Sequence, residues 1–175
     1  MNKEEIIDAL NEKYNLFIEY IISLSQEDYE WRYQQKWTAG EQLEHIVICA
    51  KPLVQVFNMD KNLIQNTFGK TYRQGRSYEA LKSEYLYKLS EGGKAPERFL
   101  PDISTTKQKA DLIEKLRLLV HDLCAAIEKF SEEDLDSLCI PHPLFGQLTL
   151  REMLYNALYH VEHHQQLAIK YLDNR

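Results

Sequence analysis

Cysteine is scarce in this chain, and the few present do not form a disulfide framework. The 175 residues include three cysteines, Cys49, Cys124 and Cys139, and the first two lie within helical patterns. An odd number of cysteines in such positions argues against disulfides and favours a reducing, cytoplasmic compartment. The three also lack the paired spacing of a structural zinc site.

Long apolar runs and an excess of basic residues are missing as well. No segment reaches the roughly 18 uninterrupted apolar residues of a membrane span, and the start Met-Asn-Lys-Glu-Glu does not resemble a secretory signal. The chain has 21 Lys and Arg against 27 Asp and Glu, a net charge of −6. Nucleic-acid binding depends on basic residues that neutralise phosphates, so we expect no nucleic-acid partner. Without a long apolar run, we expect no membrane partner either.

Most of the sequence shows the periodicity of amphipathic helices. Long helices are predicted at about 3–24, after Thr38, at about 77–90, at about Thr105 to Phe130, and from Thr149 to about 172. Short turns follow Ser25 and Ser131. Thr38 with Glu41 and Thr149 with Glu152 have the form of capping boxes. Pro52 should kink its helix, and residues 91–96 and 139–146 are predicted to be loops.

No repeat, low-complexity tract or convincing strand interrupts this pattern. The length suits a single domain, 1–175. We therefore predict an all-α protein: an antiparallel four-helix bundle with one or two additional short helices.

Three histidines carry the most specific chemical signal. His160 and His164 lie four residues apart within an apolar stripe of the last helix, so both imidazoles face the same way. His45 lies at the margin of a broad apolar arc on the helix after Thr38. A lone half-buried histidine is ordinary, but two side by side on an apolar face both need polar partners. A shared divalent cation, with His45 as third ligand, would satisfy them and leave a coordination position open.

Other metal chemistries fit the spacing less well. Glu162 is the third residue of His160–His164, where zinc-protease signatures place the catalytic glutamate second or fourth. No glutamate lies three residues before His45, His160 or His164, as ferritin-like di-iron sites require. A phosphate-binding glycine loop and a Gly-x-Ser-x-Gly elbow are also absent.

The remaining histidines receive simpler interpretations. His121 is predicted to be solvated, and His142, between two prolines, to shape its loop in preference to approaching a ligand. His163 falls on the polar flank of the last helix beside Asn156 and is the lesser choice of ligand.

The assembled residues resemble the DinB-like superfamily of metal-dependent enzymes, which includes bacterial thiol S-transferases. The resemblance lies in residues 37–45 (WTAGEQLEH), and in residues 145–149 (FGQLT) leading into the helix with His-x-x-x-His. It implies a helical bundle, three ligands at the positions of His45, His160 and His164, and a homodimer. The sequence departs from many relatives at Gln165-Gln166-Leu167, where they place Gly-Gln soon after the last histidine.

These observations predict a metal-dependent enzyme. Zinc and nickel both suit imidazole donors, and three neutral ligands leave the full charge of the ion to acidify water or a thiol. The resemblance implies transfer of a low-molecular-weight thiol, or hydrolysis of a small-molecule substrate. No general acid or base can be named. The alternative is a non-catalytic metal-binding bundle that acts as an interaction or stress-response module.

Overall fold

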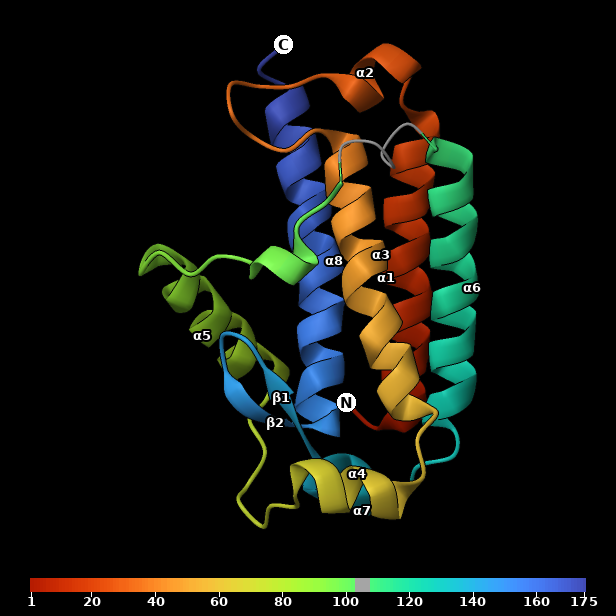
Figure 1. Cartoon of the computed structure of the whole chain (residues 1–175), viewed down its shortest axis with the longest axis vertical. Coiled ribbons are helices and arrows are strands. Elements are labelled where there is room, and N and C mark those ends of the chain that lie inside the picture. Colours follow the sequence, from red (N-terminus) through yellow and green to blue (C-terminus); the bar gives the residue numbers. More distant parts are fainter. Residues whose placement is uncertain (103–107) are drawn as a thin grey trace.

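Four long helices form the body of the protein in a computed structural model that describes residues 1–102 and 108–175 (Figure 1). They are α1 (Lys3–Ser23), α3 (Ala39–Phe57), α6 (Lys109–Ile127) and α8 (Leu150–Leu172). In Figure 1, α1 and α8 run in one direction and α3 and α6 in the other. Contacts join α1 to α8, α8 to α3, α3 to α6 and α6 to α1, which closes the bundle. The predicted all-α bundle is confirmed.

Each bundle helix contributes side chains to one core. Phe17, Leu43, Leu116 and Leu158 come from the four helices in turn and are fully buried. Two of these helices, α3 and α8, begin at the predicted capping boxes, formed by Thr38 with Glu41 and by Thr149 with Glu152. The first helix ends at residue 23, as predicted to within a residue. The predicted start of the fourth helix at Thr105 lies outside the described residues.

The connections contain more regular structure than predicted. Short helices are α2 (Gln26–Glu30), α4 (Lys61–Phe68), α7 (Glu132–Ser137) and the 3₁₀ turn η1 (Glu97–Phe99). Helix α5 (Tyr78–Ser90) matches its predicted range but packs on α8, outside the bundle (Figure 1). Pro52 lies within a continuous α3, whose predicted kink stays a prediction.

The prediction of a loop at residues 139–146 was wrong. Strands β1 (Cys139–His142) and β2 (Gly146–Thr149) form an antiparallel hairpin that pairs His142 with Gly146. Three residues make the turn, and Gly146 adopts φ +70°, the left-handed conformation that closes such a turn. Because Thr149 ends β2 and caps α8, the hairpin leads directly into the last helix and lies against it.

Candidate metal centre

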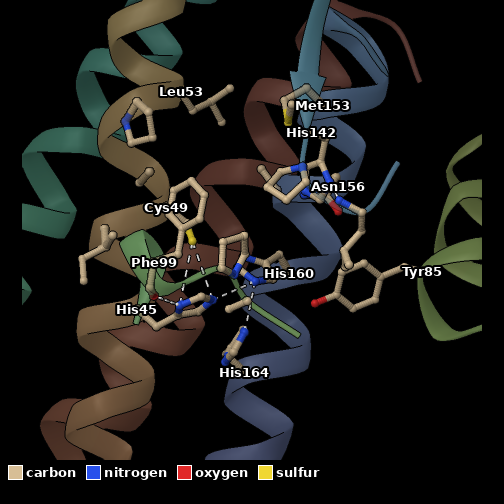
Figure 2. Close-up of a pocket in the computed structure, with 18 of the residues that line it drawn as sticks. His45, Cys49, Leu53, Tyr85, Phe99, His142, Met153, Asn156, His160 and His164 are labelled. Carbon is tan, nitrogen blue, oxygen red and sulfur yellow. Dashed lines mark hydrogen bonds between the residues drawn. The ribbon is translucent and has the colours of Figure 1, made fainter. Parts of the chain in front are cut away.

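Helices α3 and α8 bring the three predicted histidines together. The two helices are antiparallel neighbours, so the beginning of α3 lies opposite the second half of α8 (Figure 1). The Nε2 atom of His160 lies 3.2 Å from Nε2 of His45 and 3.0 Å from Nε2 of His164 (Figure 2). Within the described residues this is the one cluster of three or more potential ligands, with donor atoms all within 4.8 Å of one another.

The outer nitrogens of two rings are held by oxygen acceptors. The Nδ1–H of His45 donates to the carbonyl oxygen of Phe99 at 2.7 Å, and the Nδ1–H of His164 donates to Oε1 of Gln42. A carbonyl oxygen can only accept, so each Nδ1 carries its proton. In a neutral ring the Nε2 atom then carries no proton, and its lone pair is free to bind a metal ion. Such outer partners orient histidines for metal binding.

This donor set passes a simple test of fit for a cation. Nε2 of His160 can give a proton to only one neighbour, so at least one of the two short contacts sets lone pair against lone pair. A cation between the nitrogens would remove that repulsion. A tetrahedral ion with bonds of about 2.0–2.1 Å would space its nitrogens about 3.3 Å apart, close to the spacing here.

Burial keeps the imidazoles neutral, which ligation requires. His45 and His164 are 3% and 5% exposed. Burial lowers the pKa of His45 despite the hydrogen bond to Phe99, which acts in the opposite sense. For His160 and His164, burial and then the neighbouring imidazoles hold the pKa well below the usual value. The cluster therefore presents uncharged donors at neutral pH.

A cavity of about 560 Å³ opens onto these rings, between α3, α5, α8, η1 and the hairpin. Its wall is largely apolar, with Leu53, Phe99 and Met153 among the lining residues drawn in Figure 2. The thiol of Cys49 also faces it, 3.6 Å from Nε2 of His45, and burial raises the pKa of that thiol to about 12. Cys49 is thus a protonated neighbour of the cluster at neutral pH.

The other predicted residues fall in different places. Glu162 pairs with Lys13 and Lys82 and does not line the cavity, in agreement with the case against a zinc-protease site. His121 is solvated as predicted, with its side chain 81% exposed. His163 lines the cavity against the ring of Tyr85 but does not belong to the three-histidine cluster.

Two further residues line the cavity. His142 was predicted to shape its loop in preference to approaching a ligand; its Nδ1 does accept a hydrogen bond from the amide N–H of Leu144 at 3.1 Å in the hairpin turn, and the residue also lines the cavity. Asn156, expected on a polar flank, is 8% exposed and lines the same cavity, with its amide 3.3 Å from His142 Nε2. Helix α5 and the hairpin cover this side of α8, which periodicity along a single helix does not reveal.

Sequence reasoning also missed the residues that hold the ligands. Gln42 lies three positions before His45 and therefore on the same side of α3, a spacing that could have identified it. Phe99 contacts His45 through its backbone carbonyl oxygen, so the identity of its side chain could not have indicated this role. Trp37 was noted only within a motif, yet its ring centroid lies 5.0 Å from that of His45 and 6.1 Å from that of His164.

Comparison with known families gives one match that covers most of the chain. The family model described as DinB superfamily matches residues 9–168, nearly the whole chain. The chain belongs to the DinB superfamily. Searches of curated proteins and of solved structures found no match. Among the described residues of this DinB protein, no helix is long and apolar enough to cross a membrane.

Trp37 provides an optical readout of the cluster. We expect cobalt(II) or nickel(II) to quench the tryptophan fluorescence saturably, because the Trp37 ring contacts two of the proposed ligands. The chain has two tryptophans, and Trp31 does not line the cavity. Quenching should therefore persist in Trp31→Phe and largely disappear in Trp37→Phe. Quenching carried by Trp31 would place the ion elsewhere.

Proposed function

We propose that this DinB protein is a metal-dependent enzyme whose divalent ion is held by His45, His160 and His164. The observation that carries the proposal is the convergence of three Nε2 atoms whose rings are neutral, two of them with Nδ1 committed to an oxygen acceptor. Zinc or nickel is the proposed ion, since imidazole suits both. The cytoplasmic location and the homodimer stay predictions.

The residues of the chain have distinct roles in this proposal. When bound, the ion would acidify a coordinated water or thiol, to a pKa of about 7 for water on zinc. Phe99 and Gln42 hold two imidazoles in the required tautomer, and a largely apolar wall surrounds the space in front of the rings. The proposed reaction is transfer of a low-molecular-weight thiol to an electrophile, or hydrolysis of a small-molecule substrate.

The cavity favours this function over a non-catalytic metal-binding module. An ion that only stabilised the bundle would need no open side, since structural zinc sites are closed by four protein ligands. Here the three rings line a cavity large enough for a small molecule. Through this cavity an added thiol could reach the ion.

Cobalt substitution tests the proposal. We expect a small thiol, added to the cobalt-loaded protein, to change the visible absorption spectrum saturably, because a coordinated thiol is deprotonated by the metal charge. The same titration of His45→Ala should be flat. Conjugation of that thiol to a generic electrophile should also accelerate.

Two results would count against the enzyme. A spectral change without acceleration for any thiol or hydrolysable substrate tested would favour the binding module. No spectral change, in protein shown to hold one metal, would mean that a protein side chain closes the fourth position.

A further inference from the structure

The charge of the cavity wall is opposite to that of the whole chain. The protein carries 27 acidic and 21 basic side chains, yet no Asp or Glu is found among the described residues that line the cavity. Lys94 and Arg98 do line it, and both are exposed. Neither forms an ion pair with the part of the chain that the structure describes. Within residues 1–102 and 108–175, the cavity thus offers two cations that have no acidic partner.

A tight turn after α5 precedes Lys94 and Arg98. After α5 ends at Ser90, Gly92 adopts φ +90° and the amide of Gly93 donates to the Lys88 carbonyl oxygen at 2.9 Å. A Cβ on Gly93 would lie 2.7 Å from that oxygen, so only glycine fits without a shift. The turn leads into residues 94–99, all of which except Glu97 line the cavity.

The same segment is tied to the three-histidine cluster. Arg98 lies in η1, which contacts α3, and directly precedes Phe99, whose carbonyl accepts the hydrogen bond from His45. Its guanidinium also lies over the Phe99 ring, 5.0 Å from the centroid. Arg98 is therefore the chain neighbour of the residue that holds His45, and its guanidinium lies against the ring of that residue. Glu97 in this segment, and Glu91 just before the turn, do not line the cavity.

The rest of the wall is neutral. Lining residues of α3 run from His45 to Val56, about 16 Å along a helix that rises about 1.5 Å per residue. Those beyond Cys49 are Ala50, Pro52, Leu53 and Val56, all apolar. Opposite them lie the apolar side chains of the hairpin and the neutral pair His142–Asn156. Burial lowers the pKa of His142 to about 4, so the pair adds no charge at neutral pH.

We propose that the cavity binds an elongated, mainly apolar small molecule that bears a carboxylate. The carboxylate faces Lys94 and Arg98 beside the three histidines, and the apolar body lies along α3 towards Val56. The assignment rests on the proposed function only in treating this molecule as the substrate. Binding itself requires no metal and no reaction.

Three eight-carbon probes test the assignment: octanoate, octan-1-ol and octylammonium. Calorimetric titration at neutral pH, on metal-free and on zinc-loaded protein, should show octanoate binding tightest and octylammonium weakest. In Lys94→Gln/Arg98→Gln, octanoate binding should weaken about three- to tenfold in both forms, as expected for partly exposed ion pairs. Octan-1-ol binding should change by less than about twofold. Lys51→Gln/Arg117→Gln removes one exposed lysine and one exposed arginine outside the cavity, and should behave like wild type.

The outcomes separate this assignment from the proposed function. Octanoate binding no tighter than that of octan-1-ol, or a preference unchanged in Lys94→Gln/Arg98→Gln, would overturn it. So would a preference seen only in the zinc-loaded form, since the ion itself would then hold the carboxylate. Failure of the protein to bind metal, with the octanoate preference intact and dependent on Lys94 and Arg98, would remove the enzyme proposal and leave the binding site.

Discussion

Replacing His160 with alanine is expected to abolish stoichiometric zinc binding. Its Nε2 atom contacts the Nε2 atoms of both other histidines, so its loss removes the central donor of the cluster. Since even outer partners of a ligand contribute about 10- to 100-fold in affinity, loss of a ligand should cost more than about 100-fold. Elemental analysis after dialysis should show about one zinc per wild-type chain and almost none in His160→Ala, His45→Ala or His164→Ala.

Three further variants make this result specific. His121→Ala removes an exposed histidine and should retain the metal. His163→Ala removes a cavity residue outside the cluster and should affect binding far less than His164→Ala. Gln42→Leu keeps the three ligands but removes the acceptor for His164, and should weaken binding about 10- to 100-fold. Full occupancy in His160→Ala would refute the assignment of the ligands.

Substitution of Glu152 by glutamine is expected to cause a large loss of stability. Its carboxylate is 1% exposed, accepts the amide of Thr149 at the start of α8, and forms ion pairs with Arg73 and Arg76. The arginine side chains left behind are 39% and 26% exposed, so the expected cost is that of lost hydrogen bonds to a charged group, about 2–3 kcal/mol. Urea unfolding at neutral pH should show a loss of about that size in the free energy of unfolding. Glu84→Gln, at a carboxylate that pairs with Arg76 but is 33% exposed, should cost less than about 1 kcal/mol.

The loss in Glu152→Gln should also depend on pH. Burial opposes ionisation of Glu152, but hydrogen bonds from Arg73, Arg76 and the Thr149 amide outweigh it and hold its pKa well below the usual value. A depressed native pKa contributes stability above the unfolded pKa of about 4.3, and that stability is lost as the pH falls towards the native pKa. The difference between wild type and Glu152→Gln should therefore narrow below about pH 4. A constant difference from neutral pH to pH 3 would contradict the role of the ion pairs.

The features predictable from sequence are those determined by neighbours along the chain. The capping boxes at Thr38 and Thr149 are local hydrogen-bond patterns, so they fixed two helix starts correctly. The spacing of His160 and His164 places both on one face of α8, and this also holds in the folded protein. The place of His45 could not be predicted from spacing along one helix, because its position opposite α8 follows from the packing of two helices.

The features that sequence could not provide depend on how far-apart segments pack. Asn156 was placed with solvent because a single helix has one apolar face, whereas α8 is covered on a second side by α5 and the hairpin. Glu44 is likewise only 5% exposed, although glutamate is usually a surface residue, and burial raises its pKa. The hairpin at 139–149 was missed because its four-residue strands and two prolines give almost no alternation of apolar and polar residues.

The most direct test of the central claim is X-ray absorption spectroscopy of the zinc-loaded protein. We predict three imidazole nitrogens at about 2.0–2.1 Å and one further oxygen or nitrogen, with a sulfur replacing that fourth atom after a small thiol is added. His163→Ala should give the same spectrum as wild type. A sulfur ligand in the absence of added thiol would identify Cys49 as the fourth ligand and close the site. Fewer than three imidazoles would contradict the three-histidine centre itself.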